Sequence, residues 1–91
     1  MGSTEHIKHQ LFTDGYTQIH EYDDPAGEYF PDHDHEGDQL VIILEGSISV
    51  KMGGVVNHVT VNNPLKIPAK EVHDVRIGEK GCKYIVGEKE A

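Results

Sequence analysis

Short apolar runs rich in valine and isoleucine, separated by turn-forming residues, are the feature that most limits how this chain can fold. Strands of four to eight residues bounded by Gly, Pro, Asn and Asp give this pattern, and no stretch keeps the apolar spacing of an amphipathic helix. The pattern therefore predicts an all-β sandwich or small barrel. The expected strands are 6–12, 16–22, 39–44, 47–52, 55–61, 65–67, 73–77 and 82–86.

The links between these runs favour hairpin connections. Residues that tolerate tight turns or stop a strand stand at 15, 45–46, 53–54, 62–64 and 78–81. A chain of 91 residues has the size of one domain. We expect a single domain over residues 1–91, with a core at 6–87 and polar termini at 1–5 and 88–91.

Histidines carry the clearest indication of chemistry. His33 and His35 are two residues apart, so on an extended strand both side chains point to the same face. His73 follows much later in the chain, and Gln39 would complete a four-residue pocket. Imidazole nitrogens are frequent ligands of transition metals, so this spacing favours a metal site at His33, His35, Gln39 and His73. The alternative is a barrel that keeps the fold without a metal. The remaining histidines are assigned to ordinary surface or core positions: His6, His9, His20 and His58.

The run at 39–44 is apolar on both faces. If Gln39 points into a barrel, the side chains at 41 and 43 do so too, and those at 40, 42 and 44 point outward. Because the outward side chains are also apolar, a neighbouring sheet from the same or another subunit is expected to cover them. This predicts a homodimer.

Composition excludes some partners. Sixteen acidic against eight basic residues give a formal charge of −8, and the basic residues form no run, which argues against binding to nucleic acid or an anionic membrane. The single cysteine, Cys82, forms no internal disulfide, and no apolar stretch resembles a signal peptide or a membrane span. We expect a cytoplasmic protein whose partner is a small molecule.

These residues and their spacing resemble the cupin family. Its first motif is a glycine, five residues, His-x-His, three or four residues, a glutamate, six residues and a glycine. The corresponding positions hold Gly27, His33, His35, Gln39 and Gly46. Its second motif resembles Pro-x-Gly-x-x-His-x-x-x-Asn, and the chain reads Pro-Ala-Lys-Glu-Val-His over 68–73, with isoleucine at 77. The resemblance implies a single-domain cupin-type jelly-roll β-barrel or sandwich that holds a metal.

Three departures from the family pattern matter most. Asn62 and Lys70 stand where the family has glycine, a mild change if the backbone there is not left-handed. Gln39 stands where the family has glutamate, so it brings a dipole instead of a charge and leaves the site neutral. Gln39 is either a weak ligand or a hydrogen-bonding partner of the ligands. Glu71 is the best candidate for another acid, and Gln39→Glu is expected to raise metal affinity.

The inward side chains predict an apolar pocket poor in cations, suited to a small neutral or metal-chelating molecule. Its expected walls are Val41, Ile43, Ile48, Val50, Met52, Val75 and Ile77, and its expected mouth is Tyr22, Tyr29 and Phe30.

These features predict a metal-dependent enzyme of the dioxygenase, isomerase or lyase type, with Fe, Mn, Ni or Zn as its cofactor. For a general base, only Glu71 and Tyr22 are candidates. The alternative is a non-catalytic cupin module that binds or senses a small ligand or a metal. A storage barrel is a third, less favoured reading, because storage cupins are usually long two-domain chains.

Overall fold

The computed structural model describes residues 3–91, and the expected predominance of antiparallel β-structure is confirmed. The chain begins with helix α1 (Ser3–Thr13), and strands β1 to β6 follow. Their bounds are β1 (Gln18–Asp24), β2 (Tyr29–His33), β3 (Gln39–Met52), β4 (Val55–Val59), β5 (Leu65–Ile67) and β6 (His73–Glu88). All strand pairs are antiparallel, in the order β1-β6-β3-β4, with β2 also on β6 and β5 also on β3.

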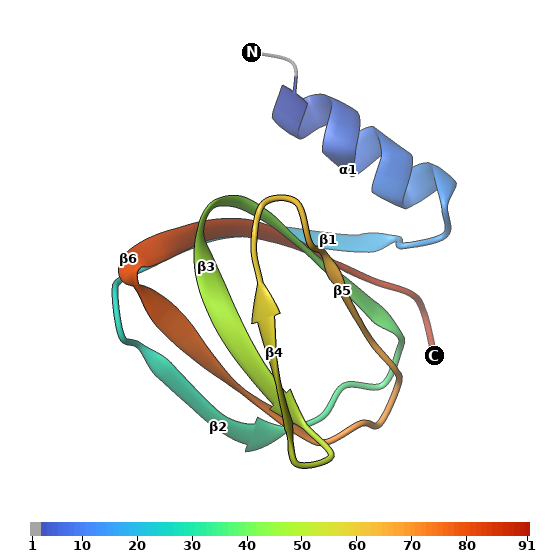
Figure 1. Ribbon diagram of the computed structural model, residues 1–91. Helices are drawn as coiled ribbons and strands as arrows, with labels where there is room; N and C mark the ends of the chain where they lie inside the picture. The colour runs from blue at the N-terminus through green and yellow to red at the C-terminus, as the bar shows by residue number, and fades with distance from the viewer. Residues whose placement is uncertain (1–2) are drawn as a thin grey trace.

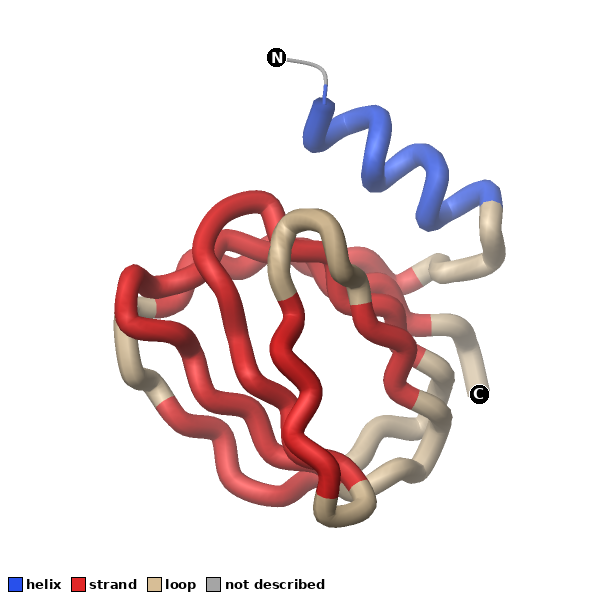
Figure 2. The backbone as a smooth tube through the Cα atoms, viewed as in Figure 1, coloured by secondary structure: helices blue, strands red, loops and turns tan. Residues whose placement is uncertain are grey.

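Two long strands organise the sheet. The sequence predicted two strands each for the regions of β3 and β6, but each region forms one continuous strand, of 14 and 16 residues. The register between β3 and β6 shifts twice, on either side of Gly46, where the backbone is left-handed at φ +87°. Irregularities of this kind bend strands, and the sheet curls around an interior (Figures 1 and 2).

The inner face of the curled sheet holds the main core. Burial alternates along the start of β3, with Gln39, Val41 and Ile43 buried as the parity of the sequence predicted. The buried members of this core are Val41, Ile43, Ile48, Val50, Val59, Ile67, Ile77, Cys82 and Tyr84.

The expected strand at 6–12 is wrong, because these residues lie in α1. Ile7 and Leu11 are four residues apart, so they share one face of the helix, and they pack in a second cluster around Ile85. The helix ends in a Schellman motif: the Gly15 N–H donates to Phe12 O at 3.0 Å, and the Tyr16 N–H donates to Leu11 O at 2.9 Å. Gly15 has the left-handed φ of +97° that this motif requires.

Helix α1 also helps to cover the apolar outer face of β3. Leu40, Ile42 and Leu44 pack against the second cluster, so the N-terminal segment of the same chain covers part of this face (Figure 1). The expected polar terminus at 1–5 lies in part outside the described residues, and its described part is helical. Among the described residues, no helix has the length and apolar character needed to cross a membrane.

Candidate metal centre

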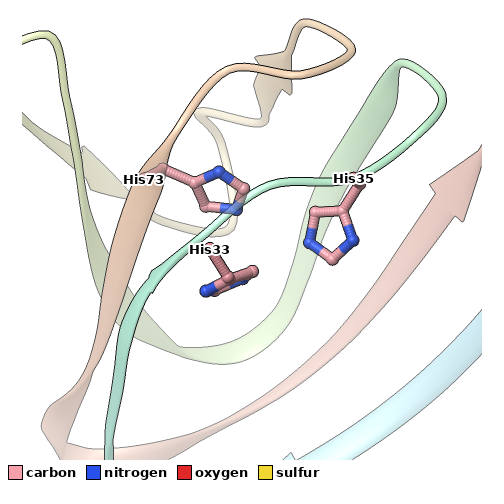
Figure 3. Close-up of side chains that lie close together, drawn as sticks. All are labelled: His33, His35 and His73. Atoms are coloured by element: carbon pink, nitrogen blue, oxygen red, sulfur yellow. The ribbon is translucent and has the colours of Figure 1, made fainter.

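Three histidines converge at one end of the interior (Figure 3). His33, at the end of β2, is the antiparallel register partner of His73, at the start of β6, and their ring centroids are 4.4 Å apart. His35 follows two residues after β2, with its ring centroid 5.0 Å from that of His33 and 5.3 Å from that of His73. One nitrogen from each ring lies within 4.8 Å of the others. We call His33, His35 and His73 the histidine cluster.

Main-chain carbonyls fix two of the three rings. His33 Nδ1 lies 2.7 Å from Pro31 O, and His73 Nδ1 lies 2.8 Å from Glu71 O. A carbonyl oxygen only accepts, so Nδ1 carries the proton in both rings and the lone pair of the neutral imidazole is on Nε2. This arrangement, one nitrogen donating to the protein and the other left for an ion, is typical of metal-binding histidines.

The spacing is compatible with a transition metal. Ligand nitrogens at about 2.1 Å from a tetrahedral ion are roughly 3.4 Å from one another. The upper limit of 4.8 Å in the cluster therefore exceeds the requirement by roughly 1.4 Å. Binding of an ion would therefore require the three ligand nitrogens to move closer together.

His35 is held in its neutral form. Burial lowers the pKa of its imidazole, and the neighbouring His33 lowers it further. The neutral imidazole is the form that binds a metal ion. The lowered pKa of His35 therefore favours its role as a ligand.

Gln39 lies beside the cluster and has an acidic partner that sequence reasoning missed. Its side chain is buried at 8% exposure and lines the same cavity as the three histidines. Gln39 Nε2 donates to Glu88 Oε1 at 2.9 Å, and this oxygen lies 3.8 Å from His35 Nδ1. The sequence predicts a polar terminus at 88–91, but Glu88 is the last residue of β6 and the register partner of Gln39.

Glu71, the acid expected near the site, contributes its main chain only. Its carbonyl oxygen accepts a hydrogen bond from His73, and Glu71 is not among the described residues that line the cavity. Parity could not identify Glu88, because its closeness to Gln39 depends on the pairing of two strands that are far apart in the chain.

Lys70 does not meet the condition under which its replacement of glycine is a mild change, because its backbone is left-handed. Its φ is +67°, and it is the only non-glycine residue with a positive φ in the described part of the chain. The Lys70 N–H donates to His35 O at 2.8 Å, which ties this turn to the segment that carries His35. A left-handed lysine costs roughly 1–2 kcal/mol compared with a right-handed one, so the turn next to the cluster is strained.

The cluster opens into a cavity of about 300 Å³. Its walls include several residues predicted for it: Val41, Ile48, Val50 and Val75, with Tyr22 and Phe30. Three predicted wall residues, Ile43, Met52 and Ile77, pack elsewhere in the core, and Tyr29 instead donates to Asp74 Oδ2 at 3.1 Å. Five lining residues were not predicted: Asp24, Glu28, Ile67, Tyr84 and Val86. Among the described residues that line the cavity, none is Lys or Arg, as predicted.

Tyr84 gives the cavity a second polar group. Its hydroxyl donates to Asp24 Oδ2 at 2.6 Å, and its ring stacks on Tyr22 with centroids 5.2 Å apart. Burial raises the pKa of the Tyr84 hydroxyl, and the hydrogen bond to Asp24 raises it further. Tyr84 therefore keeps its proton at neutral pH and acts as a hydrogen-bond donor.

Comparison with solved structures finds the same fold in other proteins. A cupin superfamily protein from Desulfitobacterium hafniense aligns with a TM-score of 0.71 at 19% identity, over 80% of this chain and 67% of that one. DMSP lyase DddQ from Ruegeria pomeroyi aligns with a TM-score of 0.72 at 22% identity, over 79% of this chain but 37% of the lyase. KdgF from a Halomonas species aligns with a TM-score of 0.69 at 17% identity, over 80% of this chain and 69% of that one. These likenesses concern the fold.

Comparison by sequence gives the family. No curated protein matches the chain. The family model described as Cupin domain matches residues 20–87, which run from β1 to the penultimate residue of β6 and contain the whole histidine cluster and Gln39. The chain therefore belongs to the cupin domain family.

Proposed function

We propose that this protein is a metal-dependent enzyme that acts on a small molecule, with a divalent ion held by His33, His35 and His73 and contacted by Gln39. The anchoring of the His33 and His73 rings carries this proposal, because it leaves Nε2 of both rings available in the same region. Fe, Mn, Ni and Zn all accept imidazole and amide-oxygen ligands, so each of these four ions fits the donor set.

The bound ion would act as a Lewis acid toward an oxygen of the substrate. The chain's own residues have separate tasks. Aliphatic walls such as Val41 and Val50 hold the apolar part of the substrate and exclude water. Tyr84 keeps its proton and donates it to Asp24, which orients the hydroxyl so that its oxygen can accept a hydrogen bond from a polar group of the substrate.

The reaction is of the dioxygenase, isomerase or lyase type. A lyase reaction is compatible with the fold, since DddQ, one of the solved structures similar to this chain, is a DMSP lyase. The substrate is a small neutral or metal-chelating molecule, because no cationic side chain lines the described cavity to balance a strongly anionic one.

Elemental analysis of the freshly purified protein beside its His33→Ala variant tests the metal site. Near-stoichiometric metal that is lost in His33→Ala supports the proposal, and His9→Ala is the matched control because His9 is exposed on α1. Loss of metal from both variants would mean that binding is non-specific. Absence of metal after incubation with Fe, Mn, Ni and Zn would contradict the metal site.

The second candidate is a non-catalytic module that binds or senses a ligand or a metal. The neutral donor set favours it, because Gln39 replaces the family's charged ligand. Oxygen uptake with catechol-like or β-diketone compounds separates the two readings: uptake by the loaded protein, and not by loaded His33→Ala, supports an enzyme. Binding without turnover of any compound supports the module.

A homodimer and a cytoplasmic location belong to the same proposal. Support for a dimer comes from exposed valines on β4, at one end of the strand order: Val55 is 60% exposed and Val56 is 52% exposed. Analytical ultracentrifugation that detects only monomer at tens of micromolar protein would contradict the dimer.

The single cysteine supports the cytoplasmic location.

A further inference from the structure

We propose that Glu88 is a positioning residue for the metal centre: it holds the NH2 group of Gln39 so that the amide oxygen is offered to the ion, and it supplies the negative charge that residue 39 lacks. The inference rests on the metal site of the proposed function. It assigns a role to a residue that stands outside both cupin motifs.

Glu88 is fixed in place, although it lies near the end of the chain. Its Oε1 accepts from Gln39 Nε2 at 2.9 Å, and its Oε2 accepts from the Gly37 N–H at 3.2 Å. The next residue, Lys89, donates its N–H to Asp38 O at 2.9 Å. Gly37 is so closely packed that a Cβ there would overlap Lys89 O. The end of β6 is therefore joined to the loop that leads from His35 to Gln39.

The chemistry of the pair sets the orientation of the amide. An ionised carboxylate only accepts hydrogen bonds, so the end of the Gln39 amide that faces Glu88 must be its NH2 group. The amide oxygen is then at the other end of the group, free to accept or to bind an ion. Only this oxygen is a useful ligand, because the amide nitrogen has no available lone pair. Without Glu88, nothing else in the described contacts of this side chain selects that orientation.

Glu88 also supplies a negative charge close to Gln39, which itself has none. A charge-assisted hydrogen bond at 2.9 Å polarises the amide and makes its oxygen a better donor to a cation. Oε1 of the same carboxylate is 3.8 Å from His35 Nδ1, so its field also reaches a second candidate ligand. The Glu88 side chain is 18% exposed, which limits screening by water. The carboxylate is therefore supplied by Glu88, the hydrogen-bond partner of Gln39, and not by residue 39 itself.

This arrangement changes the expected effect of Gln39→Glu. A glutamate at 39 would place a second carboxylate against Glu88, at the 2.9 Å separation now held by a hydrogen bond, where like charges repel. The single substitution therefore does not raise metal affinity, contrary to the expectation from the sequence. The exchange Gln39→Glu/Glu88→Gln removes the repulsion and leaves one carboxylate in the pair.

Titration of the metal-free protein with Co²⁺, followed by calorimetry and by the visible absorption of the bound ion, tests this inference without any activity assay. Glu88→Gln and Glu88→Ala are expected to weaken Co²⁺ binding by roughly ten- to a hundredfold. Gln39→Glu alone binds no more tightly than the unmodified protein, and the exchange variant restores the affinity or exceeds it. Glu45→Gln is the charge-matched control, because its side chain is 75% exposed on β3.

The outcomes separate the two proposals. If the unmodified protein binds no Co²⁺, or His33→Ala binds it equally well, the metal site itself fails and the role of Glu88 fails with it. If the unmodified protein binds Co²⁺ and both Glu88 variants match Glu45→Gln, only the role of Glu88 is overturned. Two further results would show that Glu88 has a merely structural role. In the first, the exchange variant binds Co²⁺ no more tightly than Glu88→Gln. In the second, Glu88→Gln unfolds at a lower urea concentration while its Co²⁺ affinity and the spectrum of the bound ion stay unchanged.

Discussion

The hydroxyl of Tyr84 and the carboxylate of Asp24 form a 2.6 Å hydrogen bond in the wall of the cavity. Tyr84 is four residues before Glu88 on β6, which places the pair roughly 13 Å along the strand from the glutamate beside the histidine cluster. The cavity therefore has a metal-binding end and a separate end that offers hydrogen-bond acceptors. A substrate that spans both would be oriented by them.

Tyr84→Phe is expected to lower the free energy of unfolding by about 1–2 kcal/mol, because it removes a hydrogen bond to a charged acceptor that is half-buried. Urea denaturation at pH 7 measures the change. Tyr22→Phe is the control: its ring stacks on Tyr84 and is kept, and Tyr22 is 42% exposed, so the expected change is below about 0.5 kcal/mol. Equal changes in the two variants would contradict a specific role for the Tyr84 hydrogen bond.

Local spacing was enough to predict part of the candidate site. His33 and His35 follow from the period of a strand, and the motif spacing added Gln39 and His73. The structure brings all four to one cavity. Glu88 and Asp24 were not predicted, because their closeness to Gln39 and Tyr84 depends on long-range strand register and side-chain orientation that no local pattern encodes.

The sequence predicts a strand in place of helix α1 for a different reason. Its apolar face consists of little more than Ile7 and Leu11, so helical periodicity is weak, and packing against Ile85 stabilises it. One signal was present in the sequence. Gly15 followed by Tyr16 is typical of a helix end in which the residue after the glycine contacts the last turn. A hairpin turn also favours glycine, so this signal alone does not distinguish the two structures.

Gly46→Ala is expected to destabilise the protein by roughly 3 kcal/mol or more, because two effects add. The φ of +87° disfavours any side chain, and a Cβ there would overlap the carbonyl oxygen of Gly81 on β6. Gly53→Ala is a matched control, since its φ is +55° but nothing lies within 4 Å of its Cβ. That variant is expected to lose about 1 kcal/mol. Thermal unfolding of the two variants separates the cost of the left-handed backbone from the cost of the overlap with Gly81 O. Similar losses of stability in both variants would exclude a cost from the overlap.

Leu11→Ala tests whether α1 is an integral part of the domain. Leu11 is 2% exposed and packs on Ile85, so its truncation is expected to cost about 2–4 kcal/mol. The next residue, Phe12, is 60% exposed, and Phe12→Ala is expected to change the free energy of unfolding by less than about 1 kcal/mol. If Leu11→Ala were as mild as Phe12→Ala in urea denaturation, the helix would contribute little to stability.

Cys82 is expected to react with thiol reagents only slowly in the folded protein. Burial raises the pKa of its thiol to about 11 from a usual value of 9.0, and the Asp24 carboxylate adds to the effect. The nucleophile is the thiolate, so labelling by a disulfide reagent at pH 8 should become fast only in urea. Fast labelling of the folded protein at pH 8 would mean that the thiol is accessible and ionises normally.

The same raised pKa of Cys82 predicts how stability changes at alkaline pH. Between the usual value of 9.0 and the folded value of about 11, the unfolded chain loses this proton while the folded chain keeps it. The unfolded state then binds fewer protons, so the free energy of unfolding falls as the pH rises through this window. Lysines and tyrosines also titrate there, so Cys82→Ala is the control. Urea titrations from pH 7 to pH 11 should show the stability of the unmodified protein falling more steeply than that of Cys82→Ala, and parallel curves would contradict the raised pKa of this thiol.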